Sequence, residues 1–511
     1  MPAATRPPAD AKKTAANKSA ERSTAPIGPL DRFFEITKRG STITREVRGG
    51  FVTFFAMCYI IVLNPLILST APAANGKFIT GASANGPSVT AVAATALVAG
   101  VMSILMGLIA NFPMAMAAGL GVNSVVTFTI AQQSGMSFAD AMGVVVIAGL
   151  IIFVLVMTGF RQAVFNAVPH ALKLAISVGI GLFIAFIGFA NAGFSMPGAG
   201  TPVQLGTGGS LATWPVFVFV IGLLLTIVLV SRKVKGGILI AIVVTTILAA
   251  IVQAIGNFGA RYDPGGGKPV INPDGWQLNV PTLDGGKVAG KPDFSILGHF
   301  SISGAWVHLG VITFIMMVFT VFLSDFFDLM GTSVAIGAEA GLLDEKGMPA
   351  RTREILAIDA LGAVAGGAGG ISSNTGFIES ASGVGDGART GLSTIVTGIC
   401  FLLATFFAPL VEAVPYEAAA PALVVVGFLM MMQVRSINWE DFEVAIPAFL
   451  TIVVMPFTYS ITNGIGAGFI SFLVIKAARG KFKEIHWLMW LVSILFVIYF
   501  AFDPIKNALH G

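Results

Sequence analysis

Long runs of apolar residues, each close to the length of a membrane-crossing helix, follow one another through nearly the whole chain from Phe51 to Phe502. A helix that crosses the hydrocarbon core of a bilayer needs about 20 mostly apolar residues. Another run, at 487–502, is short, and the sequence leaves open whether it spans the membrane or lies in its interface. Spans are predicted at 48–70, 88–110, 113–131, 139–160, 169–190, 213–231, 236–256, 306–332, 351–369, 372–386, 390–411, 418–434, 442–459 and 462–479.

These spans form two groups of seven, separated by a long stretch rich in Gly, Pro and Asp. An odd number of spans in each group turns the second group upside down in the membrane, which is the inverted-repeat architecture of many secondary transporters. We therefore predict an all-α membrane protein of about 14 segments in two inverted seven-segment repeats. The expected parts are a disordered cytoplasmic tail at 1–45, a first repeat at 46–256, an extracellular linker loop at 257–305, a second repeat at 306–480, and a C-terminal apolar segment and tail at 481–511.

Charge sets the orientation and excludes several classes of protein. Lys and Arg gather in the amino-terminal tail, in the short loop 232–235 and in the cluster 476–483, which indicates that these parts face the cytoplasm. We expect a multi-pass protein of a bacterial plasma membrane with a cytoplasmic amino terminus. Only 11% of the residues are charged, against about 25% in soluble domains, and no basic patch suggests nucleic acid. The two cysteines and five histidines show no metal-ligand spacing, so no metal is expected.

Glycine interrupts the third and tenth segments at corresponding places in the two halves, in PMAMAAGLGVNSVVTF from Pro113 and in ISSNTGFIESASGVGDG from Ile371. Irregular backbone at membrane depth is tolerated only where it is buried in protein or lines a polar cavity. The half-helix that resumes after each break directs free N–H groups and a positive dipole end toward that cavity. The two breaks therefore predict a binding site for a polar solute.

Carboxylates inside spans strengthen this prediction, because translocon scales assign about 2.5 to 3.5 kcal/mol to an Asp at a helix centre. Asp325 and Asp328 lie three residues apart on one helical face, Glu379 follows the tenth-segment break, and we expect the three to face each other. A carrier is favoured over an enzyme or a channel, since the chain lacks a Gly-x-Ser-x-Gly or His-Glu-x-x-His motif and a repeated filter. Solvated or capping roles are expected at segment ends for Asp386, Arg389, Glu412 and Glu417.

Six dispersed stretches also carry a family resemblance: DRFFEITKRGSTITREVRGGFVTFFAMCYIIVLNPLIL, NFPMAMAAGLGVNS, FLSDFFDLMGT, GLLDEKG, SSNTGFIESASGVGDGARTGL and APALVVVGFLM. In these the chain resembles the AzgA-like adenine, guanine and hypoxanthine permeases, a branch of the nucleobase:cation symporter (xanthine/uracil permease) family. The resemblance implies a core domain of segments one to four and eight to eleven, and a gate domain from the rest. It also implies short strands in the third and tenth segments, with a base bound between them and the eighth.

Particular residues match the family's motifs. Glu379 matches a tenth-segment glutamate that would hydrogen-bond the base, and Asn123 matches a third-segment asparagine of this branch. Asp325 and Asp328 both fall in the eighth-segment acidic motif, and alignment leaves open which of them is equivalent to the family's acid. The resemblance also implies Thr332 as a base-binding residue, one turn beyond Asp328, where uracil carriers have a histidine.

The chemistry of the predicted site suits a purine base imported by proton symport. An ionised carboxylate accepts hydrogen bonds from the N–H edge of guanine or hypoxanthine, and Phe377 or Phe326 could cover a ring face. We expect Asp325, Asp328 or Glu379 to carry the coupled proton, with no cofactor beyond the coupling ion. A uracil or xanthine carrier, an anion transporter of the same fold, sodium coupling and a homodimer are left open.

Overall fold

Helices make up most of this structure, a computed structural model of the chain. It describes residues 28–79, 88–158, 168–198, 200–261, 272–277, 279–281, 289–344, 348–349, 351–411 and 413–510. Within these ranges ten helices are long and apolar enough to cross a membrane, and three shorter helices are apolar too. The prediction of a multi-pass α-helical membrane protein is confirmed. Of the expected tail at 1–45, residues 1–27 lie outside the described residues, and α2 and the start of α3 occupy part of the rest.

The first half begins with a short helix and continues through seven segments. Its elements are α2 (Pro29–Phe34), α3 (Ile43–Met57), α4 (Ile60–Leu68), α5 (Val89–Leu105), η1 (Met106–Ala110), β1 (Met116–Ala118), α6 (Leu120–Val125), η2 (Val126–Ile130), α7 (Phe138–Thr158), α9 (His170–Asn191), β2 (Ser195–Met196), β3 (Gln204–Leu205), α10 (Trp214–Ser231) and α11 (Gly237–Gly256).

The second half follows the same plan and adds one helix at its end. Its elements are α12 (Ile302–Ala340), α13 (Thr352–Ala368), β4 (Asn374–Gly376), η3 (Ile378–Ser380), α14 (Ala381–Gly385), α15 (Gly391–Ala404), η4 (Thr405–Phe407), α16 (Ala408–Val411), α17 (Tyr416–Met431), η5 (Met432–Ser436), α18 (Phe442–Phe457), α19 (Ile461–Ala478), η6 (Phe482–Glu484) and α20 (Trp487–His510).

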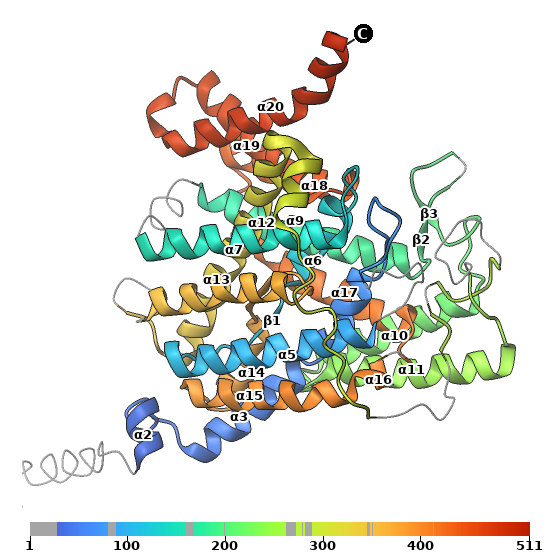
Figure 1. Cartoon of the computed structure of the whole chain (residues 1–511), viewed down its shortest axis with the longest axis vertical. Coiled ribbons are helices and arrows are strands. Elements are labelled where there is room, and N and C mark those ends of the chain that lie inside the picture. The colour runs from blue at the N-terminus through green and yellow to red at the C-terminus, as the bar shows by residue number, and fades with distance from the viewer. Residues whose placement is uncertain are drawn as a thin grey trace, which may run out of the picture.

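The helix contacts repeat between the halves. α7, the fourth segment, packs on α13 and α12, the ninth and eighth segments. Its counterpart α15, the eleventh segment, packs on α5 and α3, the second and first segments. Likewise α9 packs on α18, as α17 packs on α10. In Figure 1, α7, α13, α5 and α15 run side by side across the view. Exchanging each segment for its counterpart leaves the pattern unchanged, as two inverted repeats require.

Glycines let the paired helices approach until their backbones touch. A Cβ atom built on Gly398 of α15 would lie 2.6 Å from the carbonyl oxygen of Gly100 in α5, and one on Gly427 of α17 would lie 2.4 Å from that of Gly181 in α9. Lipid supplies no hydrophobic force between helices, so close packing of small residues holds them together. The first crossing is internal to the predicted core domain and the second to the predicted gate domain.

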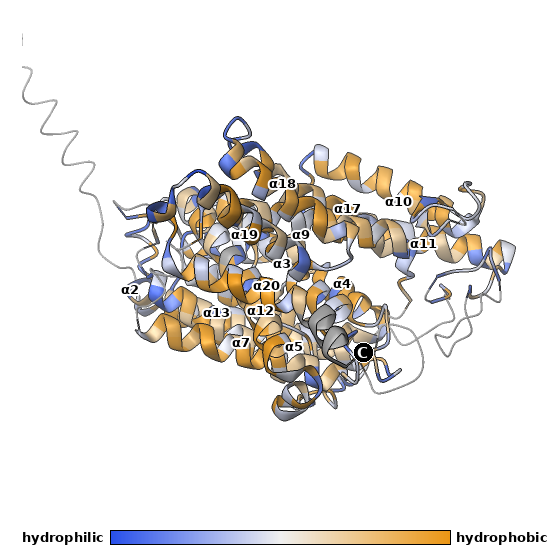
Figure 2. Ribbon diagram, turned by 90° about the horizontal axis from the view of Figure 1, so that it is seen from above, coloured by the Kyte–Doolittle hydropathy of each residue, from blue (hydrophilic) through white to orange (hydrophobic). Residues whose placement is uncertain are grey.

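The outer surface matches a lipid environment. Hydrophobic colour dominates the helices in Figure 2, and polar colour gathers in the loops and at helix ends. Apolar side chains such as Val154, Leu224 and Leu403 are 57–58% exposed, although each lies within a long apolar helix. Such exposure is expected where side chains contact lipid tails.

One predicted span has other bounds in the structure, and two further features go beyond the prediction. α12 begins at Ile302 and ends at Ala340, beyond both ends of the predicted span 306–332, and its backbone breaks at Gly310, where φ is 69°. The run left open at 487–502 is the helix α20, which packs along α19 with Phe496 fully buried. Part of the linker also packs on the helices, because Trp276 is fully buried against Val218 and Ala249.

We predict that Gly398→Ala lowers the melting temperature of the purified protein, because the added methyl group would press on the α5 backbone. Overpacking of this kind costs about 1 to 3 kcal/mol. Gly331→Ala is the matched control, since a Cβ atom there has nothing within 4 Å. Equal melting temperatures for the two variants in detergent would show that the helices do not depend on this contact.

Candidate functional site

Two short strands lie at the centre of the site and join the halves of the chain. β1 and β4 pair antiparallel, with Met116 opposite Gly376, Ala117 opposite Thr375 and Ala118 opposite Asn374. Gly119 N donates to Ser373 O at 2.9 Å, and Phe377 N donates to Ala115 O at 2.9 Å. The predicted breaks in the third and tenth segments are therefore real, and their exposed backbone groups satisfy each other.

Each strand leads directly into a half-helix that packs against α12. α6 follows β1 at Leu120, η3 and α14 follow β4 at Ile378, and all of them contact α12. The first N–H groups of such half-helices have no partner within the helix. The starts of both half-helices thus lie against α12, the helix that carries Asp325 and Asp328.

Asp325 is bound to the second break. It is 1% exposed, and the Ser373 hydroxyl donates to its Oδ1 at 2.8 Å. Among the described residues its Oδ2 atom has no hydrogen-bond partner. One turn further along α12, Asp328 lies close enough to Glu379 for their carboxylates to interact electrostatically. The structure therefore brings the three predicted acids together.

Glu379 is oriented by a residue from the first segment. The Tyr59 hydroxyl, at the junction of α3 and α4, donates a hydrogen bond to Glu379 Oε1. Tyr59 is fully buried, whereas Glu379 is partly exposed. A charged acceptor makes this hydrogen bond stronger than one between neutral groups. The glutamate is thus held on one side and free to contact a solute on the other.

Sequence reasoning missed a further acid beside the breaks, Asp359 of α13. It is 1% exposed, and its Oδ1 accepts from the Thr375 hydroxyl at 2.7 Å and from Gly376 N at 3.2 Å. Asp359 therefore fixes the position of strand β4 through these two hydrogen bonds. The available signal was a single acid within the apolar stretch ILAIDALGAV, which is the criterion that selected Asp325.

Two buried asparagines flank the strands with unused hydrogen-bonding capacity. Asn123 of α6 was predicted, and Asn374 of β4 was not. Both are fully buried, and within the described part of the chain neither amide group has a hydrogen-bond partner for its side-chain nitrogen or oxygen. An amide offers two donors and an acceptor. These groups fit a polar solute with both donors and acceptors.

The remaining predicted residues lie in different surroundings. Thr332 is 8% exposed on α12, one turn beyond Asp328. Phe377 is 7% exposed and connects β4 to η3, two residues before Glu379. Phe326 stacks on Phe322 of the same helix, with ring centroids 5.6 Å apart, so this contact is packing along α12.

A small cavity touches Asp328 and lies between the predicted core and gate domains. Its volume is about 10 Å³, hardly enough for one water molecule. Binding of any larger solute therefore requires these walls to separate. The wall residues come from α6, α9, α12 and α17 or their ends: Gly119, Gly121, Val122, Ile176, Ser177, Ile180, Ser324, Asp328 and Met430.

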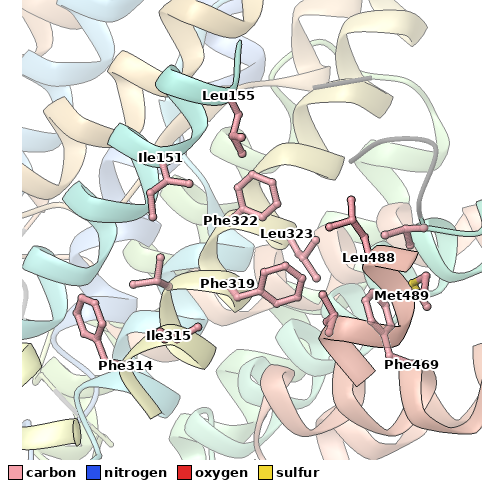
Figure 3. Close-up of a pocket in the computed structure, with 13 residues that line it drawn as sticks. Ile151, Leu155, Phe314, Ile315, Phe319, Phe322, Leu323, Phe469, Leu488 and Met489 are labelled. Carbon is pink, nitrogen blue, oxygen red and sulfur yellow. The ribbon is translucent and has the colours of Figure 1, made fainter. Parts of the chain in front are cut away.

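A larger cavity of about 280 Å³ lies elsewhere, among α7, α12, α19 and α20. Figure 3 shows Ile151 and Leu155 of α7 on one side, Phe319 of α12 in the middle, and Leu488 and Met489 of α20 on the other. All of the lining side chains are apolar. A polar solute would lose its hydrogen bonds to water there without replacement, so this cavity is not the solute site.

Charged residues at the segment ends show one correction. Glu417 was expected to be solvated or to cap a helix, but it is fully buried, and its Oε1 accepts from Gln277 N at 2.8 Å. The linker folds over the start of α17, which the sequence did not indicate. Glu412 lies outside the described residues. Asp386 instead binds Lys235 and Arg48 at the surface, and the Lys235 ammonium, then the Arg48 guanidinium, hold its pKa below the usual range.

Comparisons with known proteins find relatives over nearly the whole chain. A model described as Permease family matches residues 44–466. The guanine/hypoxanthine permease PbuG of Bacillus subtilis is 38% identical over 93% of this chain and 100% of its own length. The adenine permease AdeP of Escherichia coli is 34% identical over 93% of this chain and 96% of its own. The transmembrane domain of a cyanobacterial bicarbonate transporter, BicA, shares the fold with a TM-score of 0.55 at 16% identity, covering 83% of this chain and 97% of that domain.

We predict that Asp359→Ala lowers the melting temperature strongly, because two buried donors on β4 lose their acceptor. Leaving such groups unpaired costs about 1 to 3 kcal/mol for each. Asp359→Asn keeps an oxygen at the same place and is the matched control, with a smaller expected loss. A thermal-shift assay in which both variants melt like the wild type would contradict this role of Asp359.

Proposed function

The chain belongs to the Permease family, and we propose on that premise that it imports purine nucleobases, namely hypoxanthine, guanine and adenine, by proton symport across a bacterial plasma membrane. Members of this family are transporters and not enzymes. Relatives named for guanine, hypoxanthine and adenine transport support the substrate class. The observation that carries the proposal is the group of acids, Asp325, Asp328 and Glu379, gathered where the two paired breaks meet α12.

The hydrogen-bonding groups match a purine edge. The Glu379 carboxylate, oriented by Tyr59, accepts from ring N–H groups. The amides of Asn123 and Asn374 supply donors for the carbonyl and ring nitrogens of the base, and acceptors for its amino groups. A neutral base needs such directional partners more than a net charge. Phe377, two residues before Glu379, is the aromatic residue that we propose to cover a face of the ring.

The acids also support the proposal of proton coupling. Asp325 is buried, Asp328 interacts with Glu379, and Asp325 and Asp328 interact with each other. Several ionised carboxylates close together and away from water raise the free energy of the protein, through mutual repulsion and loss of hydration. In this proposal one of them binds a proton when the site faces the outside and releases it inside, so that base and proton move together.

Alternating access in this proposal is a movement of the core domain against the gate domain. The closed cavity beside Asp328 has walls from α6 and α12 on the core side and from α9 and α17 on the gate side. Separation of these walls would open the site to each face in turn. The basic loop 232–235 and the basic amino-terminal region support a cytoplasmic amino terminus in this proposal.

We predict that cells lacking their own purine carriers take up radiolabelled hypoxanthine, guanine or adenine when they express this protein, and that a protonophore abolishes the uptake. Glu379→Ala should lower uptake at least tenfold, because removal of an oriented charged acceptor costs about 1.5 to 3 kcal/mol. Uracil and xanthine serve as competing substrates. If the wild-type protein is present in the membrane and no purine is taken up, the substrate class is refuted. Uptake that the protonophore does not affect would refute only the proton coupling.

A second prediction concerns the ion pair that joins the predicted domains. Asp386 follows α14 in the core and binds Lys235, which precedes α11 in the gate, with N and O 2.5 Å apart. Because the pKa of Asp386 is lowered, the carboxylate stays charged at neutral pH, and the pair is lost only as the pH falls through that lowered pKa. Ion pairs exposed to solvent stabilise a structure by at most about 1 kcal/mol.

Lys235→Gln should therefore change the maximal uptake rate by up to about fivefold and leave the KM unchanged, since the pair holds one arrangement of the domains. Arg48→Gln is the matched control, because Arg48 and Asp386 both belong to the core. The measurement is initial-rate uptake at varied base concentration. An equal effect of both substitutions on the rate would argue against a link between the domains.

A further inference from the structure

The large apolar cavity of Figure 3 lies at the seam between the two domains that must move in the proposed transport cycle. One wall is Ile151 of α7 with Phe319 and Phe322 of α12, which belong to the core. The opposite wall is Phe469 of α19, which belongs to the gate. Whatever occupies this cavity touches both domains at once.

α20 forms the third side of the cavity, beyond the seven segments of the second repeat. Its residues Leu488, Met489 and Val492 line the space. The helix is fixed to α19 by the Ser493 hydroxyl, which donates to Phe469 O at 3.2 Å, and by Phe496, which packs edge-on against Phe469 and Phe319. α20 therefore contacts both the gate and the core, and it closes the third side of the space between them.

The pocket continues directly into the lipid-facing surface. Ile151 and Ile315, two of its own lining residues, are 41% and 42% exposed. On α20 the neighbouring side chains Leu491 and Ile494 are 47% and 50% exposed. Within a bilayer this opening faces lipid tails, and a space with only apolar walls does not hold water.

The start of α20 fixes the level of the pocket in the membrane. Trp487 is 60% exposed, and Trp490 stacks on Phe482, with ring centroids 6.1 Å apart. Tryptophans of this kind mark the headgroup level of a bilayer. Leu488 to Val492 follow within about 8 Å along the helix, at 1.5 Å per residue, so they lie at most about 8 Å below that level. Lys483, exposed just before this helix, supplies a positive charge at the headgroup level.

We propose that the pocket is a binding site for one acyl chain of a membrane phospholipid, which wedges between the core and gate domains behind α20. The chain fills a space that is otherwise poorly packed, and its headgroup lies at the level of Trp487 and Lys483. A bound lipid supports the arrangement in which the core and gate are apposed here. The lipid must rearrange when the domains move, so lipid composition affects the transport rate. The binding claim itself does not depend on the purine assignment.

The test uses the full-length protein in vesicles of phosphatidylglycerol and phosphatidylcholine that contain a phospholipid with a photoactivatable diazirine in one acyl chain. After irradiation, mass spectrometry maps the labelled residues. We expect labelling of the peptides that contain Leu488 to Val492 and Phe314 to Leu323, at a level above that of other lipid-facing peptides. Val492→Trp fills the pocket and should reduce this labelling at least fivefold, whereas Ile494→Trp, on the exposed side of the same helix, should leave it unchanged.

Labelling that is uniform over all exposed apolar positions, or that survives Val492→Trp, would overturn the proposal. If Val492→Trp does not fold, Ile315→Trp fills the pocket from α12 and serves in its place. Loss of pocket labelling with unchanged hypoxanthine uptake would refute the regulatory consequence. Failure of all purine uptake in the wild type would refute the proposed substrate and leave the labelling result valid.

Discussion

The pairing of β1 with β4 is the constraint on which the rest of the structure depends. Two segments that stop being helical within a membrane leave backbone groups that lipid cannot satisfy. Each break satisfies the other, through the ladder from Met116 and Gly376 to Ala118 and Asn374 and through the flanking bonds at Gly119 and Phe377. Neither break is stable without its partner, so the two halves of the chain have to meet at this point. The glycine crossings that let helices touch hold the remaining segments around it.

The acids follow from the same constraint. Asp359 accepts from Thr375 and Gly376 behind β4, and Asp325 accepts from Ser373 beside it, so strand and carboxylates stabilise each other. Glu379 comes directly after the strand and is bound by Tyr59 of the first segment. A solute between the breaks therefore meets groups whose positions are fixed from several segments. This arrangement suits a carrier, because binding at the centre of the membrane and movement of whole domains are separate tasks.

Much of this architecture could be predicted from the sequence, because span length, the odd number of segments and the paired Gly-rich breaks are local signals. Asp325, Asp328 and Glu379 could be selected because acids are costly inside spans. Asp359 obeys the same rule and was passed over, and Asn374 has no periodic or charge signal at all. Glu417 was misjudged because its burial depends on Gln277, a linker residue far away in sequence. The packing of α20 on α19 and α12 likewise depends on tertiary contacts that no local pattern encodes.

The most direct test of the central claim is an experimental structure of the protein with hypoxanthine bound. The account predicts density for the base between the ends of β1 and β4, hydrogen-bonded to Glu379, facing Asp325 and Asp328 on α12, with the amides of Asn123 and Asn374 within reach. Density for the base away from Glu379 and from both strands would contradict it, even in a protein that transports purines.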